Sequence, residues 1–353
     1  MPAERTLITV KEAKSPFYVG VDVGGTSIKI GIVDDFGRPI DTGDINEAGE
    51  HRRVIAIKTE PQPQTAAALM SEAILDLLKR VGIDKKQCGG IGLGIPSTMD
   101  KKTHKLRQPP NLHTWEGFAM TDELAKLSGL PTFFANDANA AAFGEYWVGS
   151  GSGQPSIALL TLGTGIGTGI IIDGKMVDGT NGYGGECGHL VIDCSEDALL
   201  CGCGQRGHLE AYCSATGVAR RTLNQTGTRE SSIRSKITPE TKLSDVAKIV
   251  FQEAERGDTL AQEIIDDTAR FLSLGIVSIL NTVDAECIVL GGAMTFGGKG
   301  HPVGQRFLQK VSQEVKSRSF PAVAANLTID FAVLGGDAGY IGAAGIARAE
   351  VNR

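Results

Sequence analysis

The 353-residue sequence is poor in aromatic side chains, which make up 5% of it. So few rings leave little surface on which nucleic-acid bases can stack. Positive charge is also scarce, because 35 Lys and Arg residues face 41 Asp and Glu residues and the net charge is −6. No apolar run approaches the roughly 18 residues that a membrane helix needs. These shortages disfavour nucleic acid and membranes as partners.

The beginning of the sequence lacks the apolar stretch and the small-residue cleavage site of a signal peptide. The 7 cysteines are odd in number, and five of them fall between Cys187 and Cys213. A disulfide framework uses an even number spread through a small secreted chain. We therefore expect a cytoplasmic protein with reduced thiols, and the clustering of the cysteines favours a metal site.

Glycine is abundant, with 46 residues, but only 13 prolines accompany it and the glycines are not spaced in threes. This composition excludes collagen and argues against Pro/Gly-rich disorder. Hydrophobic residues make up 41% of the chain, which is enough for a core. At this length a chain usually splits its core, so we expect two domains.

Two segments share one pattern, a β-branched strand, a glycine turn and a second strand. The first has a strand at Tyr18–Val23 and the turn Gly24-Gly25-Thr26, and the second has strands at Ile157–Leu162 and Thr168–Ile172 around Gly163-Thr164-Gly165. The pattern predicts hairpins, and its repetition indicates an internal duplication with one copy in each domain.

Helical patterns fill much of the remaining sequence. Apolar residues recur with a helical period over 69–81, where Gly82 is placed to end the helix. A long apolar helix is predicted over 258–283, and Asp337 is placed as the N-cap of a last helix. Strands that alternate with helices predict an α/β class with parallel or mixed sheets.

The glycine turns are candidate phosphate sites. Consecutive glycines point several backbone N–H groups the same way and let a phosphate approach closely. Asp22, just before Gly24 and Gly25, is placed to hold a metal ion or its water ligands beside the phosphates. The alternative is a plain hairpin turn with a capping Asp. The second turn, at Gly163–Gly167, favours the phosphate interpretation.

Two familiar nucleotide motifs are excluded. The segment Gly292–Gly300 only approximates a P-loop, because its Lys is misplaced and no Ser or Thr follows. The segment Gly202–Gly207 satisfies GxGxxG but lacks a preceding strand and is interleaved with cysteines. It is therefore not a dinucleotide fingerprint.

A cluster of soft ligands surrounds that second segment. Cys201 and Cys203 are one residue apart, His208 follows, and His189 precedes them. Four such donors on glycine-rich turns suit a tetrahedral zinc ion. The alternative is a set of buried, inert thiols.

Candidate acids and bases are fewer. Asn136 and Asp137 follow a strand at 132–135 and begin a helix, and the end of a strand in an open α/β sheet is the usual place for a ligand. A lone Asp there is also a common helix cap. Glu186 lies near His189 and Glu210 near His208, where any exposed Glu would fit the same description. Asn111 is uninformative by itself.

Taken in order, these motifs resemble the ROK family, whose sugar kinases belong to the actin/hexokinase-like superfamily. The resemblance extends from about Tyr18 to Ala349. The motifs are DVGGTSIK from Asp22, GIPS from Gly94, PNL around Asn111, NDANAAAFGE from Asn136, LGTGIG from Leu162, GECGH from Gly185, CGCGQRGHLE from Cys201, VLGGAM from Val289 and LGGDAGYIGAA from Leu334.

The resemblance implies roles for the matching residues. Asp137 matches the catalytic base, which accepts the proton of the sugar's primary hydroxyl during phosphoryl transfer. The expected sugar-binding residues are Asn111, Asn136, Asp137, Glu186, His189 and Glu210. The expected nucleotide-binding residues are Asp22, Gly24, Gly25, Thr26, Lys29, Gly163, Thr164 and Gly165, with Gly291 and Gly292 beside the adenosine. The expected zinc ligands are His189, Cys201, Cys203 and His208.

The implied fold is α/β, an actin/hexokinase-like (ribonuclease H-like) duplicated two-domain fold with a central cleft. We expect a small domain at 16–135, completed by a C-terminal helix at 338–353, and a large domain at 136–337 with the zinc-binding loop. The implied activity is ATP-dependent phosphorylation of the 6-hydroxyl of glucose, with Mg²⁺, a structural Zn²⁺ and a homodimeric assembly. Kinases for N-acetylmannosamine, N-acetylglucosamine or fructose share the same motifs, and polyphosphate is an alternative donor.

The sequence departs from the family at His208, where a third Cys is usual. A His₂Cys₂ zinc site is chemically sound, with Cys194 or Cys213 as alternative ligands or with the metal lost. The family also contains sugar-responsive repressors with a helix-turn-helix domain before the first strand. Only 17 residues precede Tyr18, too few for that domain. Asp137 and both glycine turns disfavour a catalytically inactive sugar sensor.

Overall fold

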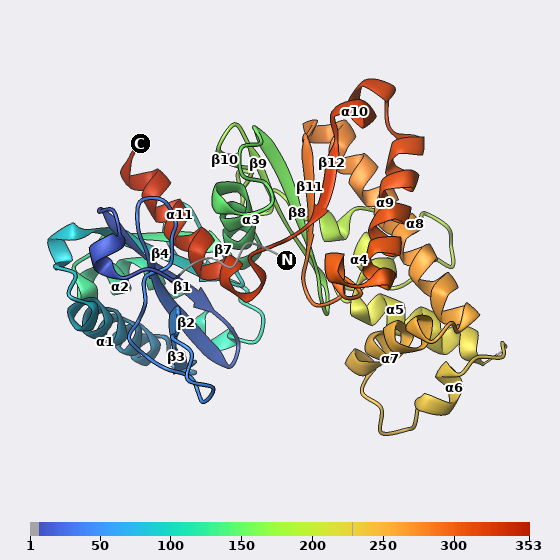
Figure 1. Cartoon of the computed structure of the whole chain (residues 1–353), viewed down its shortest axis with the longest axis horizontal. Helices are drawn as coiled ribbons and strands as arrows, with labels where there is room; N and C mark the ends of the chain where they lie inside the picture. Colours follow the sequence, from blue (N-terminus) through green and yellow to red (C-terminus); the bar gives the residue numbers. More distant parts are fainter. Residues whose placement is uncertain (1–6, 228) are drawn as a thin grey trace. The chain divides into compact units, whose positions relative to one another are not determined.

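The computed structural model describes residues 7–227 and 229–353, and the chain forms two compact units (Figure 1). The first unit contains the described residues up to Gly153, with Met176–Gly184 and Val333–Arg353. The second contains Gln154–Lys175 and Gly185–Ala332. The chain therefore passes from one unit to the other after Gly153, Lys175, Gly184 and Ala332.

The first unit is built on a mixed sheet with the strand order β3-β2-β1-β4-β7. Its strands are β1 (Phe17–Val23), β2 (Ser27–Val33), β3 (Val54–Lys58), β4 (Cys88–Ile95) and β7 (Thr132–Asn136). β1 and β2 form the predicted hairpin, whereas β1, β4 and β7 run parallel. A small ribbon pairs β5 (Thr98–Met99) with β6 (Leu106–Arg107).

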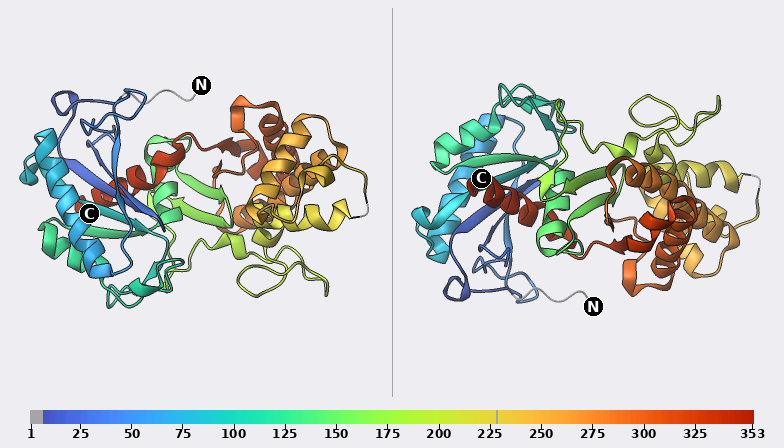
Figure 2. Two further views of the ribbon diagram at one scale, coloured as in Figure 1. Left: turned by 90° about the horizontal axis from the view of Figure 1, so that it is seen from below. Right: turned by 90° about the horizontal axis from the view of Figure 1, so that it is seen from above.

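Helices cover both faces of this sheet (Figure 2). α1 (Pro63–Val81) and α2 (Met120–Ser128) share a core with one face, and α3 (Asp137–Val148) and α11 (Ala338–Val351) pack on the other. α1 ends as predicted, because Gly82 adopts the left-handed conformation with φ 80°. Asp337 is the N-cap residue of α11, as predicted, but its carboxylate makes no capping hydrogen bond and instead accepts one from Arg53 Nη1 at 3.0 Å.

Glycine lets α11 approach the first sheet at backbone distance. A methyl group at Gly20 would overlap the carbonyl of Tyr340, and one at Gly92 would overlap the carbonyl of Ala343. On the other side of α11, Gly342 lies equally close to the carbonyl of Ala140 in α3. Part of the glycine excess therefore serves packing between α11 and its neighbours.

Replacing Gly92 with alanine is expected to destabilise the protein by about 3 kcal/mol or more, since the overlap is with backbone that cannot rotate away. Gly300→Ala is a suitable control, because nothing lies within 4 Å of the place that a Cβ would take there and its φ is not positive. The control should change stability by less than about 0.5 kcal/mol. Urea unfolding curves of both variants test this, and equal midpoints would contradict it.

The second unit repeats the arrangement of the first sheet. Its strand order is β10-β9-β8-β11-β12, with an antiparallel β8–β9 hairpin beside parallel β11 and β12. The strands are β8 (Ser156–Leu162), β9 (Ile166–Ile172), β10 (Lys175–Met176), β11 (Cys287–Gly291) and β12 (Thr328–Phe331). The same order around the same kind of hairpin confirms the predicted duplication.

The helices of the second unit pack largely against one another beside its sheet (Figure 1). They are α4 (Leu209–Cys213), α5 (Ala215–Thr226), α6 (Ile233–Lys236), α7 (Leu243–Glu255), α8 (Thr259–Val283), α9 (Pro302–Arg318) and α10 (Pro321–Asn326). α8 matches the long helix predicted from the sequence, with Asp258 as its N-cap. Among the described residues, no helix is both long and apolar enough to span a membrane.

Residues 136–153 group with the first unit, whereas the sequence analysis assigned them to the second domain. The reason is the close packing of α3 on α11, which small residues permit at Gly342 and Gly144. This packing depends on two segments about 200 residues apart. The predicted division into domains at 16–135 with 338–353 and at 136–337 remains a prediction.

Candidate functional site

One group of candidate residues lies at the carboxyl edge of the first sheet. Asp22 in β1 is paired with Gly94 in β4, and Ile95 in β4 is paired with Asn136 at the end of β7. Because these three strands are parallel, their carboxyl ends meet at one edge. Asp22, Asn136 and Asp137 therefore share the edge where open α/β sheets bind ligands.

Asn136 is the residue that caps α3. Its Oδ1 accepts hydrogen bonds from the backbone N–H groups of Ala138 (3.0 Å) and Asn139 (3.3 Å), and its Nδ2 donates to the carbonyl of Ser97 (3.2 Å). The exposed Asp137 carboxylate accepts a local bond from Ala138 N at 2.9 Å. The capping role considered for Asp137 is thus filled chiefly by its neighbour.

The two aspartates of this edge have perturbed acidity. Asp137 is accessible to solvent, yet the protein atoms around its carboxyl group displace enough water to raise its pKa above the ordinary value, and the N–H of Ala138 opposes the shift. Burial also raises the pKa of Asp22, which nearby Lys29 lowers and Asp137 raises further. A carboxylate with a raised pKa is a better proton acceptor, as a general base requires.

The first glycine turn is held in shape by its surroundings. Gly24 donates its N–H to the carbonyl of Ser27 at 3.0 Å, and Thr59 Oγ1 donates to the carbonyl of Gly24 at 2.7 Å. Gly25 and Thr26 are exposed at the tip, and a methyl group at Gly25 would lie 3.6 Å from Asn111 Cβ. The turn, Asn111 and Asp22 thus belong to the same part of the first unit.

Lys29 lies beside Asp22 in the same part of the first unit. It stands opposite Asp22 in the β1–β2 ladder, and its Nζ donates to the carbonyl of Gly336 at 3.1 Å. Its ammonium group is therefore held by backbone while it acts electrostatically on Asp22.

The second glycine turn connects β8 and β9 in the second unit. Gly163 donates its N–H to the carbonyl of Gly165 at 3.0 Å, and its own carbonyl accepts from Ala215 N at 2.8 Å. Thr216 Oγ1 donates to the carbonyl of Thr164 at 2.9 Å. These bonds fix the turn against the start of α5, so it has the rigidity that a phosphate site needs.

A cavity of about 440 Å³ lies beside this turn. It is bounded by the turn, by one side of α7 and by the segment after β11. Its lining residues are Gly163, Thr164, Ala215, Ser244, Asp245, Ala247, Lys248, Phe251, Ala293, Met294, Phe296 and Gly297. Gly291 ends β11, and Gly292 follows with φ 88° against the carbonyl of Leu162, so both candidates lead directly into the lining. Sequence reasoning missed the α7 residues, whose only signal is an amphipathic pattern.

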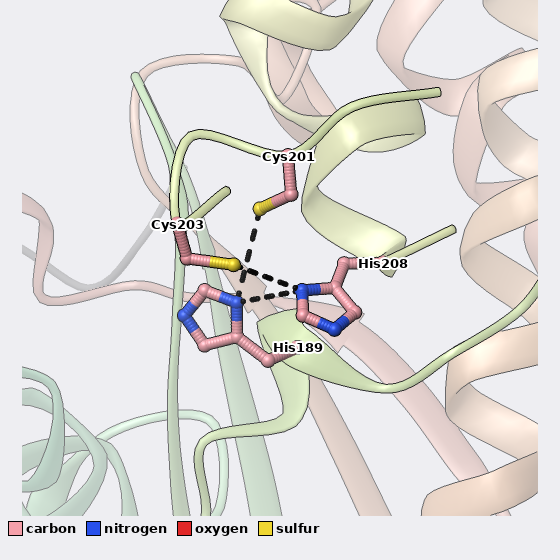
Figure 3. Close-up of side chains that lie close together, drawn as sticks. All are labelled: His189, Cys201, Cys203 and His208. Atoms are coloured by element: carbon pink, nitrogen blue, oxygen red, sulfur yellow. Dashed lines mark hydrogen bonds between the residues drawn. The ribbon is translucent and has the colours of Figure 1, made fainter. Parts of the chain in front are cut away.

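The four predicted metal ligands converge in the second unit (Figure 3). His189 Nδ1 lies 3.2 Å from His208 Nδ1 and 3.8 Å from Cys201 Sγ, and Cys203 Sγ lies 3.2 Å from His208 Nδ1. All four donor atoms lie within 4.8 Å of one another. Tetrahedral zinc with bonds of about 2.0–2.3 Å places its ligand atoms about 3.3–3.8 Å apart, so the cluster fits that ion.

The alternative ligands lie outside this cluster. Cys213 is buried and donates to the carbonyl of Thr268 at 3.6 Å, and Cys194 is exposed. Cys203 is also exposed, which does not match a buried, inert set of thiols. Burial raises the pKa of Cys201 to about 11. A metal ion bound here would therefore displace a thiol proton.

Glu210 links the metal cluster to the second glycine turn. Its Oε1 accepts from Cys201 Sγ at 3.5 Å, and its Oε2 accepts from Ile166 N at 2.9 Å. A side chain at Gly165 would overlap this carboxylate. Glu186 is exposed and immediately precedes the short 3₁₀ turn Cys187–His189, so both lie on one loop.

The comparisons with known proteins agree over nearly the whole chain. The ROK family model matches residues 18–350. A glucokinase of Halalkalibacterium halodurans is 34% identical over 341 residues, which cover 95% of this chain and 96% of that protein. A ROK hexokinase structure from Thermus thermophilus is 27% identical with a TM-score of 0.74, covering 95% of this chain and 99% of that one. A ROK glucokinase from Streptomyces griseus, solved with glucose and AMPPNP, is 28% identical with a TM-score of 0.68, covering 94% and 99%.

Proposed function

Because the chain belongs to the ROK family, we propose that it is an ATP-dependent sugar kinase that phosphorylates the 6-hydroxyl of glucose. The observation that carries this proposal is Asp137, an exposed carboxylate of raised pKa at the carboxyl edge of three parallel strands. Its place beside the glycine hairpin of β1 and β2 supports phosphoryl transfer. The similarity to glucokinases supports glucose as the acceptor.

In this proposal Asp137 accepts the proton of the 6-hydroxyl as the oxygen attacks the γ-phosphorus of ATP. The O–P bond forms, the bond to the β-phosphate oxygen breaks, and ADP leaves. Such a reaction depends mainly on positioning and on charge stabilisation. Asn136 caps α3 and thereby fixes the direction from which Asp137 reaches the sugar.

Backbone N–H groups of Gly25 and Thr26 in the first turn, and of Thr164 and Gly165 in the second, are proposed to bind the phosphates, because those of Gly24 and Gly163 donate within their own hairpins. Lys29 would add positive charge, and Mg²⁺ bound with the nucleotide would offset the negative charge of the phosphates. Asp22 is placed to hold that ion or its water ligands. Burial raises the pKa of Asp22, and a bound cation would lower it again by stabilising the ionised carboxylate.

The cavity beside the second turn is proposed to take the adenosine. Gly163 and Thr164 form one side of it, and the segment after Gly291 and Gly292 forms another. Phe251, Phe296 and Met294 supply apolar surface for the base. Most small-molecule sites combine such a lining with a few polar groups, which Asp245 and Lys248 provide here.

Six polar side chains are proposed to bind the sugar hydroxyls. They are Asn111, Asn136 and Asp137, together with Glu186, His189 and Glu210. Amide and carboxylate groups discriminate strongly between sugars, because a missing hydroxyl leaves a polar group unpaired. Zinc held by His189, Cys201, Cys203 and His208 would stiffen the loop that carries the second set.

We further propose that the enzyme is cytoplasmic and homodimeric. All seven cysteines lie in the described part of the chain and none forms a disulfide, which suits a reducing compartment. The family resemblance supports the dimer. Analytical ultracentrifugation tests the mass.

A coupled ADP-release assay across hexoses tests the proposed function. We expect glucose to give the highest kcat/KM among glucose, mannose, fructose, N-acetylglucosamine and N-acetylmannosamine. Replacing ATP with polyphosphate in the same assay, with direct detection of the sugar phosphate, identifies the donor. Turnover restricted to an N-acetylhexosamine would contradict glucose as the substrate, and no turnover with any hexose would contradict the kinase proposal.

A further inference from the structure

A buried carboxylate near the end of α3 has no part in the chemistry described above. Glu145 is 0% exposed and accepts three hydrogen bonds from backbone N–H groups. Its Oε2 accepts from Ser150 at 2.8 Å, and its Oε1 accepts from Val333 at 3.0 Å and Leu334 at 2.7 Å. Three such charge-assisted bonds are what a carboxylate needs to remain buried.

The three N–H groups lie where the chain passes between the units. Ser150 belongs to the segment that leaves the first unit after Gly153, and Val333 is the first residue of the segment that returns. One side chain therefore holds two connections that are about 180 residues apart in sequence. Gly149 is required beside it, because a side chain at that position would overlap Glu145 Oε2.

The other two connections follow Lys175 and Gly184, at the two ends of the segment Met176–Gly184. This segment is held by hydrogen bonds to other residues of the first unit. Asn139 in α3 donates from Nδ2 to Asp178 Oδ1 at 3.2 Å, and Lys101 Nζ donates to the carbonyl of Gly179 at 2.9 Å. The helix that begins with Asp137 thus holds three of these connecting segments directly, two through Glu145 and one through Asn139.

We propose that Glu145 is a positioning residue that couples the connections between the units to α3, and thereby to Asp137. The inference rests on the proposed function, since it requires the units to rearrange when sugar binds. If the connections are rigid, the rearrangement brings the Asp137 carboxylate to one defined position relative to the sugar. If a connection is released, Asp137 also samples positions from which it cannot accept the proton of the hydroxyl. Glu145 touches neither the sugar nor the nucleotide in this proposal.

A purely structural role would give a different result, and Asp34 provides the matched control. Asp34 is also 0% exposed and accepts N–H bonds from Lys14 (3.1 Å), Phe36 (3.0 Å) and Arg38 (2.9 Å). It lies in the same unit but holds a loop at residues 34–38 that is not a connection. Asp34→Asn and Glu145→Gln each remove a buried carboxylate that accepts three backbone N–H bonds, and Asp34→Asn also removes an ion pair with the Arg38 guanidinium (2.7 Å), so it is the more demanding control.

The test compares these two variants by kinetics and hydrogen exchange. In Glu145→Gln an amide N–H₂ must face at least one backbone N–H, so one connection is released whichever way the amide points. We expect kcat for hexose phosphorylation to fall about tenfold, while the Kd for adenosine stays within about twofold, because the cavity proposed for the adenosine belongs to the second unit alone. The N–H groups of Ser150, Val333 and Leu334 should exchange slowly in the unmodified protein and faster in the variant. Asp34→Asn should change kcat by less than about twofold and leave these three groups protected.

Equal kcat values for folded Glu145→Gln and Asp34→Asn would overturn the proposal, and so would fast exchange of the three N–H groups in the unmodified protein. If Glu145→Gln does not fold, Gly149→Ala displaces the same carboxylate without removing its charge, and the same expectations apply. An unmodified protein that phosphorylates no hexose would contradict the proposed function instead. Hydrogen exchange needs no substrate, so it still decides whether Glu145 holds both connections.

Discussion

Replacing Asp137 with alanine is expected to lower kcat for glucose phosphorylation by about 100- to 10,000-fold, the usual contribution of a general base. Sugar affinity should change much less, because the other proposed sugar-binding groups remain. Asn136 still caps α3 in the variant, so the helix should begin at the same residue. The coupled assay measures kcat, and calorimetric titration with glucose measures affinity.

The pH dependence of the unmodified enzyme gives a second readout of Asp137. The base acts in its ionised form, so kcat/KM falls as the pH falls through its pKa. Because partial desolvation raises that pKa, the acid limb should lie above the ordinary aspartate range. Asp122→Ala is a suitable control, since Asp122 is an exposed aspartate in the first turn of α2. Near-normal kcat in Asp137→Ala would remove Asp137 from the base role.

Removal of the metal is expected to weaken glucose binding by about 10- to 100-fold, as the loss of groups that support a binding site often does. His189 Nδ1 faces the cluster, so zinc would fix the imidazole whose other nitrogen is proposed to contact the sugar. Glu210 would be affected as well, because Cys201 donates to it. Metal content is measured by mass spectrometry before and after chelation, and affinity by titration. Restored zinc should restore binding.

Variants at His208 test the composition of the metal site. His208→Cys should keep about one zinc per chain, because three thiolates and one imidazole also form a tetrahedral site, whereas His208→Ala should lose most of it. Cys194→Ser is the control, because this exposed cysteine lies on the same loop but outside the cluster. In the Co²⁺-substituted protein, the thiolate-to-metal charge-transfer absorption should be stronger in His208→Cys than in the unmodified protein.

For the metal-removal experiment, unchanged glucose affinity after verified loss of zinc would contradict the proposed link between the metal site and sugar binding.

Local rules explain which parts of the fold were predictable. The hairpins around Gly24-Gly25-Thr26 and Gly163-Thr164-Gly165 follow from β-branched strands and a glycine turn, which involve neighbouring residues only. The grouping of the four candidate metal ligands was also predictable, since three of them lie within Cys201–His208. His189 joins them because the turn Cys187–His189 lies beside the start of α4.

Features that depend on distant segments were not predictable. Nothing near Glu145 in the sequence shows that Val333 and Leu334 will donate to it. The α7 residues of the cavity have no motif, because an apolar pocket is defined by its shape rather than by particular side chains. Asp337 has the residue type of a cap, yet Arg53 provides an alternative partner from another element. In each case a tertiary contact overrides the local preference.

The position of α11 in the sequence has a consequence for how the protein is made. The carbonyls of Tyr340 and Ala343 rest directly against Gly20 and Gly92, so the sheet that a ribosome produces first lacks one of its covering helices until residues 338–351 emerge. The entire second unit is synthesised in between and can fold in the meantime, since domains generally fold as units. During translation one face of the first sheet therefore remains partly exposed until α11 is synthesised. A pause or truncation before α11 would prolong this exposure and make the chain a substrate for chaperones.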